Sequence, residues 1–147
     1  MKLRPPTVLA LIALATAAGA TETIQPGYWA TTSSVSSIVH QTKSENRCIT
    51  PKAVSKFAGC YINHHYTCTC PEQSNADGRI AFRGDCVDAK GRHVSIEGEG
   101  SYTSTTLQMS ARGKFQYMGL NVPFDAHTDA HRIGDTCPSG SPGSSDQ

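Results

Sequence analysis

The chain has 147 residues, of which 37% are hydrophobic and 17% charged, and its formal net charge is +1. This length suits one domain with its own core, because a chain of this size buries roughly two-thirds of its unfolded surface. Its Lys and Arg residues form no run or patch, so we expect no nucleic-acid partner.

Residues 1–20 have the features of a secretory signal. Lys2 and Arg4 give a basic start, a mostly apolar run follows, and small residues close the segment. The run is too short to cross a bilayer comfortably, which takes about 20 apolar residues. We therefore expect cleavage after residue 20, no membrane span afterwards, and a periplasmic or secreted protein. Residues 21–137 then form a single β-rich domain, and the Pro/Gly/Ser-rich residues 138–147 form a disordered tail.

Apolar and polar residues alternate along much of the remaining chain, which is typical of half-buried strands. The clearest example is 105–117, where Leu107 and Met109 share one face and Gln108 and Ser110 share the other. In chain order the six expected extended segments are 27–39, 60–70, 79–87, 92–99, 105–117 and 123–132.

Turns and one helix separate these segments. The stretches 75–78 and 88–91 each end in a Gly that suits a tight turn between antiparallel strands. Thr50 can cap a helix and Pro51 suits its first position, so we expect one short helix near 51–58. The sequence thus predicts a mainly β fold: an antiparallel sheet of about six strands, curled into an open barrel or packed as a sandwich.

Six cysteines lie in the predicted mature chain. An even number in an exported domain favours a disulfide framework over metal ligation, although six cysteines allow 15 pairings. We expect all six to form disulfides: Cys48, Cys60, Cys68, Cys70, Cys86 and Cys137.

Strand parity suggests how these cysteines pair. If 60–70 is a strand beside 79–87, one allowed register sets Cys60 opposite Cys86, a bridge worth roughly 3–4 kcal/mol. Cys48 and Cys137 are then a second natural pair, closing a longer loop worth roughly 4–5 kcal/mol.

Cys68 and Cys70 are left over, and three interpretations stay open. A bridge between them would be strained, since extended residues two apart sit at the edge of disulfide range. A soft metal such as Cu(I) or Zn is an alternative, with His64 on the same strand face and His65 on the opposite one. A redox role is the third, although Cys-x-Cys in a strand lacks the helix dipole of most redox cysteines.

Other residues also suggest sites. His127, Asp129 and His131 share one strand face and could bind Zn or Cu, although such a row is more often a solvated surface. Glu97 and Glu99 form a carboxylate pair without any feature that would shift a pKa. No nucleophile elbow, Walker loop or dinucleotide fingerprint occurs in the sequence, so we expect no enzyme activity, no catalytic residues and no cofactor.

Several short motifs follow one another along the chain: Pro26-Gly27-Tyr28-Trp29, Cys48 followed by Thr50-Pro51, Cys60, Cys86, Gly98-Glu99-Gly100-Ser101-Tyr102, Gly134, Cys137-Pro138 and Pro142-Gly143. In this order they resemble the motifs of a bacterial family called domain of unknown function 3617. The resemblance implies an exported, small, β-rich protein with four cysteines that match Cys48, Cys60, Cys86 and Cys137, so that Cys68 and Cys70 are additions. It brings no accepted activity.

These observations favour a non-catalytic, disulfide-stabilised envelope protein that binds a partner protein or small ligand, or serves a structural role. A periplasmic soft-metal binder and a thiol-disulfide redox protein are the two alternative functions.

Overall fold

The computed structural model describes residues 22–143, so the predicted signal segment lies outside the described residues. It contains seven strands and one short helix, where the sequence predicted about six strands and one short helix. The elements are β1 (Gly27–Ser36), β2 (His40–Ile49), α1 (Val54–Phe57), β3 (Tyr66–Ala76), β4 (Arg79–Asp88), β5 (His93–Tyr102), β6 (Thr106–Tyr117) and β7 (Leu120–Gly134).

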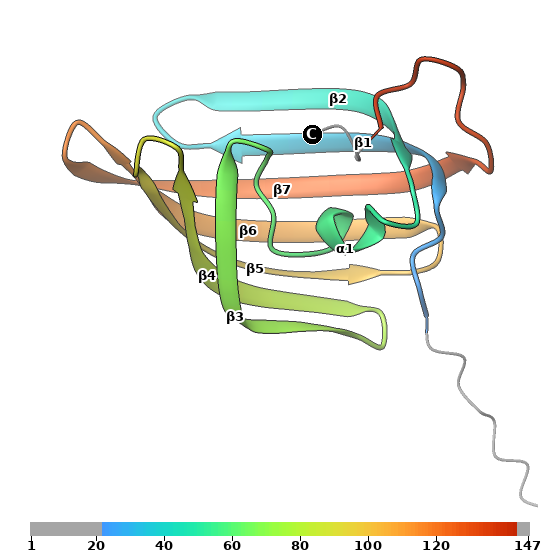
Figure 1. Ribbon diagram of the computed structural model, residues 1–147, viewed down its shortest axis with the longest axis horizontal. Helices are drawn as coiled ribbons and strands as arrows, with labels where there is room; N and C mark the ends of the chain where they lie inside the picture. The colour runs from blue at the N-terminus through green and yellow to red at the C-terminus, as the bar shows by residue number, and fades with distance from the viewer. Residues whose placement is uncertain (1–21, 144–147) are drawn as a thin grey trace, which may run out of the picture.

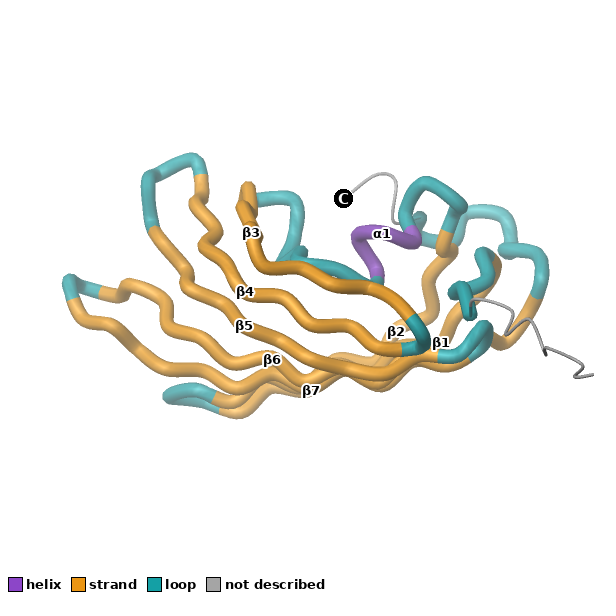
Figure 2. Tube along the Cα trace, turned by 90° about the horizontal axis from the view of Figure 1, so that it is seen from below, coloured by secondary structure: helices purple, strands orange, loops and turns teal. Residues whose placement is uncertain are grey.

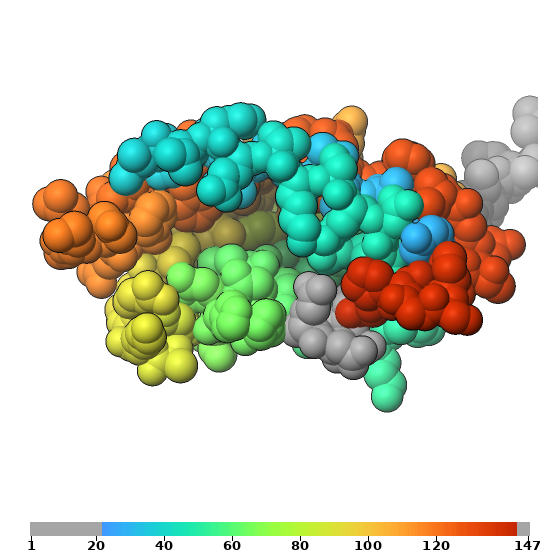
Figure 3. All heavy atoms as spheres, turned by 90° about the horizontal axis from the view of Figure 1, so that it is seen from above, coloured from blue at the N-terminus to red at the C-terminus, as the bar shows by residue number. Residues whose placement is uncertain are grey.

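All seven strands form one antiparallel sheet in the order β2-β1-β7-β6-β5-β4-β3 (Figure 1). The mainly β class and the antiparallel pairing are therefore confirmed. The sheet is open, because β2 and β3 are its two edges and do not pair with each other. Figure 3 shows these edges, β2 in cyan and β3 in green, apart from one another across the molecule.

The sequence prediction missed β2 and misplaced β3. β2 is polar and mostly exposed, with ion pairs from Lys43 and Arg47 to Glu45, so it lacks the apolar alternation of a half-buried strand. Such charges are common on edge strands, where they discourage pairing with other chains. The expected strand 60–70 was wrong in its bounds, because the chain after α1 runs as a loop until Tyr66.

The sheet curves around α1, which lies on its inner face (Figure 2). We call the side that carries α1 and the core the inner face, and the opposite side the outer face. Trp29 is fully buried on the inner face, with its ring centroid 5.2 Å from that of Phe57 in an edge-to-face contact. The other large buried side chains of this face include Ile80, Phe82, Val94, Ile96 and Leu107.

Two glycines let aromatic rings lie directly on the sheet. A Cβ on Gly98 would lie 2.4 Å from the Phe82 ring, and one on Gly113 would lie 2.8 Å from the Phe124 ring. A ring over a glycine covers exposed backbone and allows the sheet to bend at that point. The apolar inner face is therefore continuous even where the strands lack side chains.

The expected disordered tail is partly ordered. The Cys48 N–H donates to the Pro142 carbonyl at 2.9 Å, and Cys48 and Gly143 form a parallel bridge. The open edge of β2 offers unpaired backbone groups that an extended segment can satisfy. Disorder was thus the wrong expectation for residues 138–143, while 144–147 lie outside the described residues.

Candidate functional site

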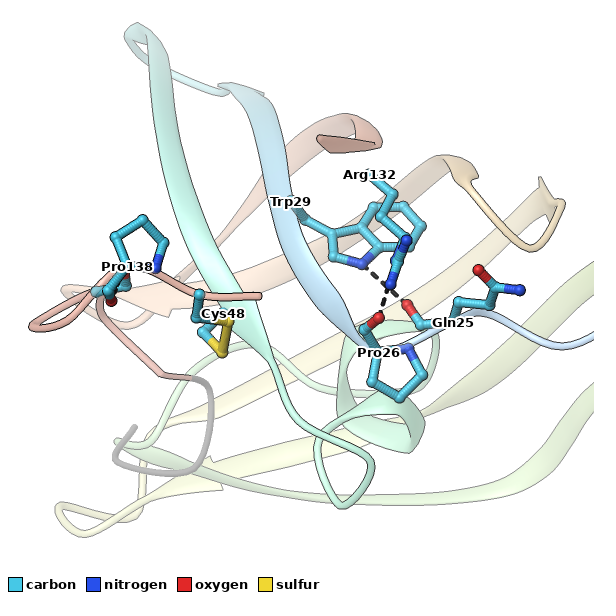
Figure 4. Close-up of a disulfide and its surroundings, with 8 residues drawn as sticks. Gln25, Pro26, Trp29, Cys48, Arg132 and Pro138 are labelled. Carbon is cyan, nitrogen blue, oxygen red and sulfur yellow. Dashed lines mark hydrogen bonds between the residues drawn. A yellow bond between two sulfur atoms is a disulfide. The ribbon is translucent and has the colours of Figure 1, made fainter. Parts of the chain in front are cut away.

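The first disulfide joins Cys48 to Cys137, the same two cysteines that the sequence analysis paired, with their Cα atoms 5.6 Å apart. Figure 4 shows this region, where both ends of the domain meet. The Trp29 Nε1 donates to the Gln25 carbonyl at 3.0 Å, and the Arg132 Nε donates to the Pro26 carbonyl at 2.8 Å (Figure 4). These contacts give the Pro26-Gly27-Tyr28-Trp29 motif a structural role, because they hold the start of the domain against β7.

The remaining disulfides are Cys60–Cys70 and Cys68–Cys86, so the expected Cys60–Cys86 pair was wrong. Because β3 starts only at Tyr66, its register sets Cys68, not Cys60, directly opposite Cys86. An irregularity between Thr69 and Glu72 then interrupts strict alternation beside Cys70. The alternation of residues along the expected strand 60–70 indicates neither the start of β3 nor its irregularity.

The two disulfides lie against each other. The Sγ atoms of Cys60, Cys68 and Cys86 are all within 4.8 Å of one another, and Cys70 is bonded to Cys60. Cys86 is fully buried and the other three are half-buried. We call Cys60, Cys68, Cys70 and Cys86 the sulfur cluster.

The structure does not assemble the expected site of Cys68, Cys70 and His64. Cys68 and Cys70 are bonded to different partners, so there is no Cys68–Cys70 bridge, and neither sulfur is a thiolate in this oxidised form. His64 and His65 do not take opposite strand faces, because both precede β3. Their rings instead lie together at the surface, with centroids 3.7 Å apart.

His127, Asp129 and His131 do share one face of β7, the exposed outer face. His127 Nε2 lies 2.9 Å from an Asp129 oxygen, and His127 Nδ1 lies 3.0 Å from the Ser110 hydroxyl. Within residues 22–143, however, the only three His, Cys or acidic ligand atoms that converge within 4.8 Å are those of the sulfur cluster. The three residues therefore share one strand face as expected, but their ligand atoms do not come close enough together to hold one metal ion.

The three side chains in contact, Ser110, His127 and Asp129, have the residue types of a nucleophilic triad. Acyl transfer also needs free N–H groups that stabilise an oxyanion. Ser110 lies in an interior strand, where the backbone pairs with β5 on one side and β7 on the other. Because this backbone is paired on both sides, the strands around Ser110 leave no free pair of N–H groups for an oxyanion.

The two glutamates differ in their surroundings. Glu97 on β5 pairs with Arg112 on β6 and with Arg83 on β4, whose Nη2 lies 2.9 Å from a Glu97 oxygen. The hydrogen bond from Arg112, and then its charge, hold the pKa of Glu97 below its ordinary value. Glu97 is therefore a fixed anion, which is unsuited to donating a proton. Glu99 has no ion-pair partner among the described residues.

This ion-paired group sits in a shallow groove of about 820 Å³ on the outer face. The groove crosses six strands, from β1 to β3, and its side chains carry both signs of charge together with hydroxyl groups. No motif in the sequence indicates this groove, because it arises only where outward residues of neighbouring strands align. We call it the outer-face groove; its polar lining is Ser34, Ser36, Glu72, Ser74, Arg83, Glu97, Glu99, Ser110, Arg112, Asp125 and His127.

Large apolar side chains also gather at two neighbouring turns, β1–β2 and β6–β7. The Ser37 hydroxyl donates to the Pro123 carbonyl at 2.8 Å and ties the first turn to β7. The sequence carried a signal for this feature, because turns are usually polar. The exposed residues are Ile38, Val39, Tyr117, Met118 and Leu120.

In the described part of the chain, no helix has the length and apolar character needed to cross a membrane. A family model with the description "Protein of unknown function (DUF3617)" matches residues 24–137. No curated protein and no solved structure matches the chain.

Proposed function

Since the chain belongs to the DUF3617 family of unknown function, we propose its role from its own geometry. It is an exported, non-catalytic binding domain of the cell envelope, and the outer-face groove holds its ligand. Residues 1–20 act as the export signal. The three disulfides support this compartment, because disulfides persist mainly in oxidising environments outside the cytoplasm.

The observation that carries the proposal is the shape and charge of the outer-face groove. Adjacent strands lie about 4.8 Å apart, so a groove across six strands is about 24 Å long. A ligand that fills such a length is extended. Both charge signs and several hydroxyl groups line the path, which suits a polymer bearing hydroxyl, amide and carboxylate groups. Peptidoglycan is the envelope polymer with this chemistry.

The central ion-paired group gives the groove its specificity. Glu97 is shared by Arg83 and Arg112, so this central group carries two positive charges against one negative charge. Each guanidinium has five N–H donors, so Arg83 and Arg112 can also donate to a ligand carboxylate without leaving Glu97 unpaired. Glu72, Glu99 and Asp125 surround this centre and can accept hydrogen bonds from ligand hydroxyl and amide groups.

Two features support a binding role over a catalytic one. The pKa of Glu97 is lowered, whereas a general acid at neutral pH needs a raised pKa. Ser110 lies in an interior strand whose backbone is paired on both sides, without a pair of free N–H groups. A fluorophosphonate probe should therefore leave Ser110 unlabelled.

The test is co-sedimentation of the oxidised mature chain with purified insoluble peptidoglycan. We expect the wild type to pellet and Arg112→Glu to lose at least tenfold in bound fraction, because a second carboxylate replaces the central cation. Arg112 is exposed, so the variant should fold. The matched control is Arg79→Glu, which changes an exposed arginine of the outward-facing row of β4 outside the groove.

Equal pelleting of wild type and Arg112→Glu would exclude the groove as the binding site. Absence of pelleting by the wild type would exclude peptidoglycan as the ligand. If Arg79→Glu lowers the bound fraction as much as Arg112→Glu does, the loss reflects general surface charge and the groove is not the binding site.

A further inference from the structure

We propose that the sulfur cluster is a redox-gated site for one soft metal ion of the Zn²⁺ or Cu⁺ class. In the oxidised protein the two disulfides close the site. When both are reduced, the thiolates of Cys60, Cys68, Cys70 and Cys86 form a four-sulfur ligand set. This set differs from the one that the sequence suggested, since it adds Cys60 and Cys86 and omits His64.

The spacing of the sulfurs carries the proposal. In a tetrahedral site with metal–sulfur bonds of about 2.3 Å, the sulfurs lie about 3.8 Å apart. The Sγ atoms of Cys60, Cys68 and Cys86 already lie within 4.8 Å of one another. The fourth sulfur, that of Cys70, is bonded to Cys60 and so starts within the same cluster. A disulfide holds its two sulfurs about 2.05 Å apart, so after reduction each bonded pair must open by roughly 2 Å to reach the spacing of a metal site.

The sheet holds the cluster together without the disulfides. Cys68 and Cys86 are directly opposed in the ladder between β3 and β4, so backbone pairing keeps their side chains adjacent after reduction. Cys60 lies on the loop after α1, and Cys70 lies at the irregularity of β3. The cluster therefore combines two fixed ligands with two that can adjust, which suits closure around an ion.

The surroundings leave room for sulfur and restrict water. A Cβ on Gly84 would lie 2.5 Å from the Cys70 Sγ, so only glycine at that position lets the sulfur approach β4. Cys86 is fully buried and its partners are half-buried. Thiolates in such an environment bind Zn²⁺ and Cu⁺ in preference to harder ions.

The chemistry balances with a dithiol as the reductant. Each disulfide accepts two electrons and two protons and becomes two thiols, while the dithiol becomes a disulfide. The metal ion then binds the four sulfurs and displaces their protons to solvent. In the reverse exchange two molecules of the oxidised dithiol accept two electrons each from the four thiolates and become dithiols again, which restores both disulfides, removes the ligands and releases the ion.

The test compares oxidised protein with protein reduced by a phosphine, which also supplies two electrons per disulfide and becomes a phosphine oxide. Zn²⁺ stoichiometry is read by native mass spectrometry, and Co²⁺ reports thiolate ligation through its sulfur-to-metal charge-transfer band. We expect one ion per reduced chain with four thiolates, and none per oxidised chain.

Two double variants identify the ligands in the reduced state. Cys68→Ser with Cys86→Ser should weaken Zn²⁺ binding at least 100-fold, because it removes the two fixed ligands. Cys48→Ser with Cys137→Ser should bind like reduced wild type, since reduction has already opened that disulfide. Fluorescence of Trp29, which is buried on the inner face, monitors the fold in every sample.

The proposal fails if reduced wild type binds no Zn²⁺, if the oxidised protein binds equally, or if the Cys68/Cys86 variant keeps its affinity. Loss of binding in the Cys48/Cys137 variant would also overturn it. If reduction alone exposes Trp29, Zn²⁺ must restore the buried-Trp29 spectrum in wild type and not in the Cys68/Cys86 variant. If Zn²⁺ fails to restore that spectrum in wild type, or restores it in the Cys68/Cys86 variant, the proposed metal site is excluded.

Discussion

At the scale of single residues, Glu97 shows how neighbouring side chains determine the role of a carboxylate. In the sequence it was one member of a Glu-x-Glu pair and resembled an acid–base site. In the structure it receives hydrogen bonds from Arg112 and Arg83, which come from the strands on either side. The residue is thus a structural anion of the outer-face groove.

This environment predicts a pH dependence of stability. The pKa of Glu97 is lowered in the fold from its ordinary 4.5, chiefly by the hydrogen bond from Arg112 and then by its charge. Its stabilising contribution is therefore fully present above pH 4.5 and is lost as the pH falls through the lower folded value. Urea unfolding at pH 7 and pH 3 should show a smaller loss of stability for Glu97→Gln than for wild type.

Glu99→Gln is the matched control, since Glu99 lies two residues away on the same strand and has no ion pair among the described residues. Its pH dependence should follow that of wild type. If Glu97→Gln and wild type lose equal stability at pH 3, the ion pairs contribute nothing to folding.

At the scale of elements, glycines under aromatic rings shape the strands of the sheet. Gly98 of β5 pairs with Phe82 of β4, whose ring occupies the place of the missing side chain. Gly113 of β6 has the same relation to Phe124 of β7. The first glycine of the Gly98-Glu99-Gly100 motif is therefore explained by ring packing on the inner face, whereas a Cβ on Gly100 would lie 2.3 Å from the Gln108 carbonyl oxygen of β6.

Gly98→Ala tests this packing. Its Cβ would lie 2.4 Å from the Phe82 ring, so the ring must shift, and overpacking of this kind costs about 1–3 kcal/mol. The control is Gly134→Ala, where the nearest atom would be 3.7 Å away and the cost should be about 0.5 kcal/mol or less. Chemical denaturation measures both, and equal midpoints for the two variants would refute the packing role of Gly98.

At the scale of the whole molecule, the Cys48–Cys137 disulfide joins the sheet edge β2 to the segment after β7. Its two cysteines are 89 residues apart, whereas Cys60 and Cys70 are only 10 apart. A disulfide restricts the unfolded chain more when its loop is longer. The long bridge is thus the main covalent constraint on the domain.

Paired replacement by Ser should reveal this difference. Loss of Cys48–Cys137 should lower the unfolding free energy by about 4–5 kcal/mol, against about 2.5–3 kcal/mol for Cys60–Cys70. Guanidinium unfolding of the two double variants under oxidising conditions measures both values. A larger loss for the Cys60/Cys70 variant would contradict the loop-length argument.

The sequence alone determined the mainly β class, the antiparallel hairpins and the short helix, because alternation and turn glycines are local signals. It also suggested pairing Cys48 with Cys137. β2 escaped prediction because an edge strand needs no apolar alternation, and its polar residues resemble a loop.

Tertiary structure alone decided the sulfur pairing and the outer-face groove. The Cys68–Cys86 bond depends on where β3 begins, and a shift of its start changes which sulfurs meet. The groove depends on the register of six strands, which aligns Arg83, Glu97 and Arg112 from separate segments. Both are set by contacts between residues distant in sequence, and no local pattern records the register that brings them together.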